Sequence, residues 1–222
     1  MTQPTPEPLR PTGSSAVHVD WHEAPALIRS LVDRVGRAAG RPVLVGVSGP
    51  VASGKSTLAR LISPCIVATD DYLPDYDVTA NHERDEPRNA DFPRLARDLE
   101  SLRSGRKTLV PVWSFHSHRR EGEREVTPGE VVICEGIHAL YETVSGLYDL
   151  AVFVESPRHV RLSRMEERER SGARGWGVEV ARSFFHEVAE PTFQRFAEVY
   201  RSRADVVVRN DAAAPGPGDS RA

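Results

Sequence analysis

The sequence is poor in the residue types that mark several protein classes. Among its 222 residues only two are cysteines. Because Cys65 and Cys134 both lie in apolar runs, we expect buried free thiols rather than a disulfide framework or a metal site. No run reaches the roughly 18 apolar residues that a membrane-spanning helix needs. The first 20 residues hold four prolines and no apolar segment typical of a secretory signal. These absences favour a cytoplasmic protein without membrane contact.

Lysine is almost missing as well. The 29 basic side chains include only Lys55 and Lys107, and the others are arginines. With a formal net charge of −3, the chain has no broad positive surface for nucleic acid or an anionic membrane, so neither is an expected partner. Lys107 stands in a polar turn, residues 104–108, where arginine would serve equally well. Only at Lys55 does the choice of lysine over arginine need a chemical explanation.

Prolines, glycines and small residues gather at both ends of the chain. This composition predicts disordered tails at residues 1–17 and 211–222 around one folded domain, residues 18–210. Inside the domain, short β-branched apolar runs alternate with helical patterns, which predicts an α/β fold whose parallel sheet is covered by helices on both faces. The expected strands are 43–47, 65–68, 131–134, 150–154 and 205–208. The expected helices are 20–36, 54–63, 92–104, 157–171 and 178–202, and a small antiparallel hairpin is expected from 108–113 and 124–127.

A glycine-rich segment follows the first expected strand. Residues 49–57 read Gly-Pro-Val-Ala-Ser-Gly-Lys-Ser-Thr and fit the phosphate-binding pattern Gly-x-x-x-x-Gly-Lys-[Ser/Thr] at the start of a helix. Glycines let backbone N–H groups surround a polyphosphate closely. Lys55 would offer the β- and γ-phosphates a compact ammonium, which the planar fork of arginine replaces poorly, and Ser56 would bind Mg²⁺. The sequence predicts a P-loop for ATP formed by Gly49, Ser53, Gly54, Lys55, Ser56 and Thr57.

Two carboxylates follow other expected strands. Asp70 comes just after strand 65–68, and Glu135 directly follows strand 131–134. Because parallel strands end at one edge of the sheet, both should lie beside the P-loop. Asp70 is our candidate to accept the proton of an attacking hydroxyl, and Glu135 is our candidate to bind Mg²⁺ directly or through water. Each could instead cap the helix that follows it.

Three arginines recur at helical spacing in the segment 157–171. Arg161, Arg164 and Arg168 stand at i, i+3 and i+7, so they share one face of a helix. This spacing predicts an arginine-rich lid over the phosphate oxygens, in which Arg161 binds the nucleotide and Arg164 and Arg168 are catalytic. Closure of such a lid would exclude water. The alternative is a solvated face whose arginines pair with the glutamates at 166, 167 and 169.

The order of these segments resembles the uridine kinase family of P-loop kinases, whose relatives include phosphoribulokinase and bacterial pantothenate kinase. The guanine-reading motif Asn/Thr-Lys-x-Asp of GTPases and the Leu-Ser-Gly-Gly-Gln signature of transport ATPases are absent. The resemblance covers about residues 42–209. It rests on GVSGPVASGKS at 46–56, DDY at 70–72, DEP at 85–87, VPVWSFHSHR at 110–119, VVICEGIHA at 131–139, and FV at 153–154 running into RLSR at 161–164.

The resemblance implies a P-loop kinase fold and a role for each matching residue. Asp70 would be the catalytic carboxylate, and Ser56 and Glu135 would be the magnesium partners. Asp85 would bind the ribose hydroxyls of the acceptor. The remaining implied contacts with substrate come from Trp113, which stands where the family has a Tyr beside the base, from His118, which stands at a base-contacting His, and from the lid residue Arg168.

Two positions depart from the pattern of the family. Met165 stands where uridine kinases carry a second consecutive Arg, and Trp176 stands where they carry another Arg near the tip of the lid. The segment between Tyr72 and Asp85 is also shorter than in the family. The ATP site and the reaction type therefore carry over more directly than the pyrimidine base. An indole at Trp113 or Trp176 could enlarge the acceptor pocket or simply pack in the core.

The expected function is phosphoryl transfer from ATP, with Mg²⁺, to a hydroxyl of a small molecule. The resemblance points first to the 5′-hydroxyl of uridine or cytidine, as in nucleoside salvage, and to a homo-oligomer. One alternative keeps the chemistry and changes the acceptor to pantothenate, a sugar phosphate or glycerate. Another is a non-catalytic nucleotide-binding regulator.

Overall fold

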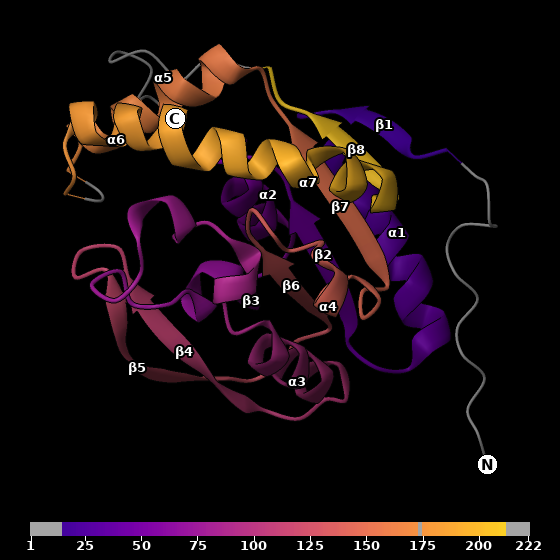
Figure 1. Ribbon diagram of the computed structural model, residues 1–222. Coiled ribbons are helices and arrows are strands. Elements are labelled where there is room, and N and C mark those ends of the chain that lie inside the picture. Colours follow the sequence, from indigo (N-terminus) through magenta and orange to yellow (C-terminus); the bar gives the residue numbers. More distant parts are fainter. Residues whose placement is uncertain (1–14, 173–174, 212–222) are drawn as a thin grey trace.

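A parallel β-sheet forms the centre of the molecule (Figure 1). The computed structural model describes residues 15–172 and 175–211, so most of both predicted tails lies outside the described residues. All pairs of neighbouring strands in this sheet are parallel, which confirms the predicted α/β class. In spatial order the strands are β1 (Val17–Asp20), β8 (Val206–Arg209), β7 (Leu150–Glu155), β2 (Val43–Ser48), β6 (Val131–Glu135) and β3 (Ile66–Ala68).

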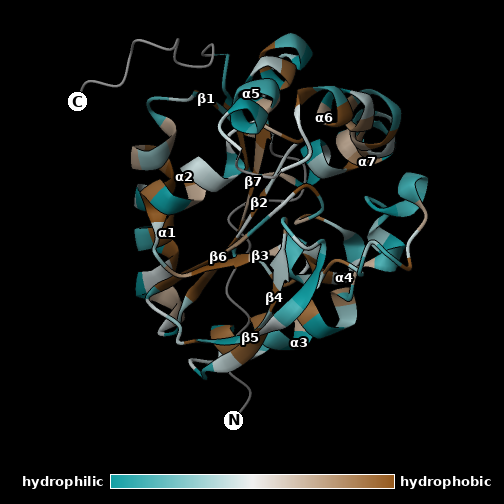
Figure 2. Cartoon of the chain, turned by 90° about the vertical axis from the view of Figure 1, so that its left-hand side faces the viewer, coloured by the Kyte–Doolittle hydropathy of each residue, from teal (hydrophilic) through white to brown (hydrophobic). Residues whose placement is uncertain are grey.

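Helices cover both faces of this sheet. Side chains alternate along β2, so that Val43, Val45 and Val47 pack against α1 (Ala24–Ala39) and α2 (Lys55–Ile62). Leu44 points to the opposite face, which is covered by α3 (Phe92–Arg103), α4 (Glu142–Ser145) and α7 (Glu190–Arg203). The apolar strands therefore run between two layers of amphipathic helices (Figure 2). No helix among the described residues is long and apolar enough to cross a membrane.

A two-stranded hairpin stands beside the main sheet. Strands β4 (Thr108–Ser114) and β5 (Arg119–Val126) pair antiparallel, as the sequence predicts. The connection from β3 to α3 contains three short 3₁₀ turns in place of a long insert. These turns are η1 (Thr69–Tyr72), η2 (Asn81–Glu83) and η3 (Pro87–Asn89).

The chain between β7 and β8 is helical, and its first helix lies above the carboxyl ends of the strands (Figure 1). Helix α5 (Arg158–Arg170) is followed by α6 (Val178–Phe184), and residues 173–174 between them are not described. The predicted helix 178–202 is present, with a π-helical turn at Phe185–Ala189 between α6 and α7. The sequence analysis missed β1, because Val17–Asp20 is short and half exposed and pairs with β8 at the other end of the chain.

Candidate active site

The P-loop joins β2 to α2 at the carboxyl edge of the sheet. Gly54, the residue before α2, has a φ of +106°, and a Cβ atom there would lie 2.5 Å from Nδ2 of Asn210. Only glycine fits this position, because any side chain would meet both the backbone strain and the neighbouring amide. The loop also contains Ala52 at a φ of +59°, which is unusual for a residue with a side chain. The sequence pattern therefore folds as a tight loop that opens onto a helix N-terminus.

A cavity of about 410 Å³ lies against this loop and gathers the predicted chemistry. The Lys55 ammonium lies within the loop and donates a hydrogen bond to the Pro50 carbonyl at 2.9 Å. Predicted residues from α2, η1, β6 and α5 meet at the cavity although they are up to 113 positions apart in the sequence. We call it the active-site cavity, and it is lined by Gly54, Lys55, Ser56, Thr57, Asp70, Glu135 and Arg168 among others.

Two of these residues fit a magnesium ion. The Ser56 hydroxyl donates a hydrogen bond to Oε1 of Glu135 at 2.8 Å, so an alcohol and a carboxylate already lie side by side. Burial raises the pKa of Glu135, while the positive charge of Lys55 acts in the opposite direction. Among the described residues no group of three or more His, Cys, Asp or Glu side chains could hold a metal. A hydroxyl and a carboxylate oxygen suit Mg²⁺, which completes its shell with water and phosphate oxygens.

Asp70 and Asp71 are adjacent but have different surroundings. Asp70 lines the active-site cavity. Asp71 accepts hydrogen bonds from the Trp113 backbone N–H and from Arg124, each at 3.4 Å, so it ties the hairpin to the turn η1. Burial raises the pKa of Asp71 in spite of these contacts. Of the two carboxylates, only Asp70 is among the residues that line the cavity.

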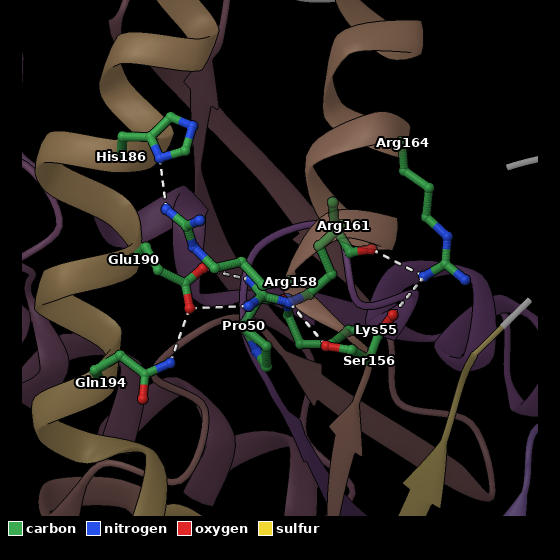
Figure 3. A network of polar contacts seen from close by, with 10 residues as sticks. Pro50, Lys55, Ser156, Arg158, Arg161, Arg164, His186, Glu190 and Gln194 are labelled. Carbon is green, nitrogen blue, oxygen red and sulfur yellow. Dashed lines mark hydrogen bonds and ion pairs between the residues drawn. The ribbon is translucent and has the colours of Figure 1, made fainter. Parts of the chain in front are cut away.

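The three lid arginines do not share one environment. Arg168 lines the active-site cavity. Arg161 is buried and makes a two-pronged ion pair with Glu190, at 2.7 and 2.8 Å (Figure 3). Arg164 donates hydrogen bonds to the P-loop carbonyls of Ala52 and Ser53 and does not line the cavity. Of the three predicted arginines, only Arg168 lines the active-site cavity, because the N-terminal half of α5 packs against α7 and the loop.

Two of the predicted acceptor-binding residues, Trp113 and His118, lie in a group separate from the active-site cavity. Trp113 is only 5% exposed, and its indole donates a hydrogen bond to the Pro74 carbonyl at 3.2 Å. It packs in an aromatic cluster with Tyr76, His118 and Trp176, which joins the hairpin to the lid. The indole of Trp176 also donates to the His118 ring. None of the four is among the residues that line the active-site cavity, so the contact of Trp113 and His118 with an acceptor stays a prediction.

The departure at Met165 has a packing explanation. Met165 is 3% exposed and lies in an apolar cluster with Ala52 of the P-loop and with Ala181 and Phe185 beyond the lid tip. Trp176 and Phe184 pack against the same cluster, and their own ring centroids are 4.9 Å apart. Apolar contacts thus join α5 and the segment after it to the P-loop.

A histidine that the sequence analysis did not single out connects three parts of the site. His138 follows β6 and is 4% exposed. Its Nε2–H donates to the Asp85 carbonyl at 2.8 Å, so Nδ1 accepts the hydroxyl proton of Tyr200 at 2.8 Å. This bridge attaches the segment that carries Asp85 to β6 and α7. A signal was present in the sequence, since a His within the apolar run VVICEGIHAL needs a buried partner.

Acid is expected to destabilise the fold through His138. Burial lowers the pKa of His138 from 6.5 to about 4, and the charges of Lys55 and Arg195 act in the same direction. Because the folded pKa lies below the unfolded one, the stabilisation is complete above pH 6.5 and is lost as the pH falls toward 4. At about 1.4 kcal/mol per pKa unit this loss amounts to about 3 kcal/mol. Urea unfolding at pH 7 and pH 4 measures it.

The comparison for this prediction is the variant His138→Gln. It should be less stable at pH 7 but should lose about 3 kcal/mol less free energy of unfolding between pH 7 and 4 than the unmodified chain. His22→Gln removes an exposed imidazole instead and is the matched control. If the free energy of unfolding fell equally between pH 7 and 4 in His138→Gln and in the unmodified chain, the assignment of a buried neutral imidazole would be contradicted.

Several known proteins are similar to this chain in sequence or in fold. The uridine kinase of Halobacterium salinarum is 30% identical over 181 residues, which cover 76% of this chain and 80% of that protein. The uridine kinase of Shewanella amazonensis is 32% identical over 184 residues, 75% of this chain and 86% of that protein. A solved structure described as a putative fructose transport system kinase from Silicibacter sp. TM1040 is 22% identical, with a TM-score of 0.69 over 83% of this chain and 98% of that one.

The sequence family described as Phosphoribulokinase / Uridine kinase family matches residues 68–213 of this chain. The matched region begins beside Asp70 and includes the hairpin, Glu135 and the lid, while the P-loop lies before it. Matches at about 30% identity over three quarters of the chain agree with this assignment. This chain is a P-loop kinase-fold protein that belongs to the Phosphoribulokinase / Uridine kinase family.

Proposed function

We propose that this protein transfers the γ-phosphoryl group of ATP to a hydroxyl of a small molecule, and that the acceptor is the 5′-hydroxyl of uridine or cytidine. The observation that carries the proposal is the active-site cavity itself. It places the P-loop lysine, Ser56, Glu135, Asp70 and Arg168 around one space. A phosphoryl-transfer site needs a phosphate cradle, a metal site and a carboxylate for the attacking hydroxyl, and these residues supply all three.

In the proposed reaction, each residue acts on a different part of the phosphoryl transfer. Asp70 accepts the proton of the acceptor hydroxyl as its oxygen bonds to the γ-phosphorus and the bond from that phosphorus to ADP breaks. Lys55 and Arg168 stabilise the negative charge on the phosphate oxygens during the transfer. Ser56 and Glu135 would hold Mg²⁺, which neutralises part of the polyphosphate charge when bound. Arg168 approaches from the lid helix α5, so its contact depends on the position of that helix.

Two observations support a nucleoside as the acceptor. Relatives at 30% and 32% identity are described as uridine kinases, and the alignments cover most of both chains. Asp85, the predicted ligand of the ribose hydroxyls, is held by its backbone to His138, three residues after Glu135. As part of this proposal we place the reaction in the cytoplasm, since the free thiols of Cys65 and Cys134 suit a reducing compartment.

The aromatic cluster favours a second candidate with a different acceptor. Trp176 contacts His118 in the region where the resemblance would place the base. Trp113 is nearly covered by its neighbours and gives little surface to a ligand. A sugar phosphate, glycerate or pantothenate would need the same phosphoryl chemistry without an aromatic base between these rings.

A panel of acceptors tests the proposed function. ADP release from Mg-ATP is measured with uridine, cytidine, pantothenate, glycerate and hexose phosphates at equal concentration. We expect kcat/KM for uridine or cytidine to exceed that of every other acceptor by at least about tenfold, which corresponds to about 1.4 kcal/mol in transition-state binding. Turnover of pantothenate, glycerate or a sugar phosphate without turnover of a nucleoside would overturn the nucleoside assignment. Binding of ATP without turnover of any acceptor would favour the non-catalytic regulator.

A further inference from the structure

Two residues that are not among those lining the active-site cavity hold the backbone of the P-loop. Two carbonyl groups of the loop, those of Ala52 and Ser53, accept hydrogen bonds from side chains behind the loop. Asn210 donates from Nδ2 to the Ser53 carbonyl at 2.8 Å. Arg164 donates from Nη1 to the Ala52 carbonyl at 3.1 Å and, more weakly, to the Ser53 carbonyl at 3.4 Å. Both side chains thus hydrogen-bond to the backbone just before the P-loop lysine.

These two side chains are also hydrogen-bonded to each other. Nη2 of Arg164 donates to Oδ1 of Asn210 at 2.9 Å, and Nη1 reaches the Ser156 hydroxyl at 3.3 Å (Figure 3 draws the Ser156 contact). The Asn210 backbone N–H donates to the Glu155 carbonyl at 2.9 Å, and the residue is 4% exposed. The pair, which we call the loop brace, is therefore anchored at the ends of β7 and β8. Its position is set by the sheet and not by the loop.

Because the peptide bond is planar and trans, the loop brace also determines which way the Gly54 N–H points. The carbonyl of one residue and the N–H of the next belong to one planar unit and point in opposite directions. When Asn210 holds the Ser53 carbonyl outward, the N–H of Gly54 is turned to the opposite side, toward the phosphate-binding surface. A cationic donor on the neighbouring Ala52 carbonyl adds a charge-assisted bond, which is stronger than a neutral one.

The brace also stabilises backbone that is unfavourable by itself. Ala52 adopts a φ of +59°, in the left-handed region that residues with a side chain seldom occupy. Gly54 has no Cβ atom, and this leaves the space that the Asn210 amide fills. A loop already held in its binding conformation loses less conformational entropy when an anion binds.

We propose that Asn210 and Arg164 are positioning residues that hold the P-loop in its anion-binding conformation and thereby set the affinity for ATP. The inference rests on the proposed function only for the identity of the nucleotide. It also changes the predicted role of Arg164. This residue acts on the backbone of the loop from behind, whereas Arg168 is the lid arginine that reaches the reacting phosphate.

The most selective variant is Asn210→Asp. It keeps the size of the side chain and the oxygen that accepts from Arg164, but it replaces the amide donor with an oxygen that faces the Ser53 carbonyl. Isothermal titration with Mg-ATP should show a Kd at least about tenfold higher, as expected for one lost hydrogen bond. The Kd of uridine, the proposed acceptor, should change less than about twofold. In turnover, KM for ATP should rise while kcat at saturating ATP stays within about threefold.

Two further variants separate the brace from other effects. Asn210→Ala removes the same donor without adding a negative charge, so it should weaken Mg-ATP binding in the same direction. Arg164→Lys keeps the positive charge but removes the planar fork that bridges the loop and Asn210, so it should also raise the Kd. The matched control is Arg170→Lys on the same helix, whose arginine pairs with Glu166 and Glu167 at the surface. That control should bind Mg-ATP like the unmodified chain.

Each outcome decides the inference. Unchanged Mg-ATP affinity in both Asn210→Asp and Asn210→Ala overturns the loop brace and leaves the proposed function intact. An equal loss of affinity for ATP and for the acceptor assigns Asn210 a purely structural role and also overturns the inference. If the unmodified chain binds no Mg-ATP, the proposed function fails and the brace fails with it. If either Asn210 variant does not fold, Arg164→Lys against Arg170→Lys decides the same question.

Discussion

Replacing Asp70 by asparagine is expected to lower kcat by about 100- to 10,000-fold while Mg-ATP still binds. Asparagine has nearly the same shape, but it cannot take the proton of an attacking hydroxyl, and a positioned general base contributes an acceleration of about this size. Asp70 lines the active-site cavity with Lys55 and Glu135, so removal of its charge should not weaken the hold on a polyphosphate. Steady-state turnover and calorimetric titration with Mg-ATP measure the two quantities separately.

The neighbouring carboxylate provides the control for this variant. Asp71→Asn changes the same functional group one position away, where the side chain holds the hairpin through Trp113 and Arg124. Its kcat should remain within about tenfold of the unmodified chain. Full turnover by Asp70→Asn would show that Asp70 is not the general base. Equal losses in both variants would mean that the local fold matters here and not one carboxylate.

Replacing Glu190 by glutamine is expected to lower the free energy of unfolding by about 3 to 5 kcal/mol. The change leaves the buried guanidinium of Arg161 without its counter-charge, and a broken buried ion pair costs about this much. Burial alone would raise the pKa of Glu190, but the hydrogen bonds from Arg161 and Gln194 outweigh it and keep that pKa below its ordinary value. Urea unfolding followed by circular dichroism measures the loss at pH 7.

A double variant shows whether the uncompensated charge is the cause. Arg161→Met combined with Glu190→Leu removes both charges and should regain most of the stability lost in Glu190→Gln. Arg201→Gln breaks the more exposed ion pair with Glu155 and should cost less than about 1 kcal/mol. A loss below about 1 kcal/mol for Glu190→Gln itself would show that this pair does not anchor α5 to α7.

The sequence predicts those parts of the fold and site whose signals are local. The pattern of residues 49–57 contains both the loop and the helix that follows it, and the apolar runs mark β2, β6 and β7 through their own composition. The parallel class follows from the alternation of these elements. Asp70 and Glu135 could be placed at the cavity because a parallel sheet brings its strand ends to one edge.

The features that the sequence does not predict depend on neighbours far along the chain. The spacing of Arg161, Arg164 and Arg168 indicates a shared helix face, but it contains no information on what packs against each turn of that face. The partner of Arg161 is Glu190 on α7, and the partners of Arg164 lie in the P-loop and after β8. Likewise, β1 forms only because β8 supplies an edge for it.

The central claim is that the cavity beside the P-loop carries out phosphoryl transfer with Asp70 as the base. Phosphorus NMR of a mixture of Mg-ATP, uridine and the protein tests it most directly, because the method identifies every phosphate product. The account predicts ADP and a 5′-phosphate monoester of the nucleoside in equal amounts, and almost none of either with Asp70→Asn. Formation of ADP with inorganic phosphate alone, or the same monoester yield from Asp70→Asn, would contradict it.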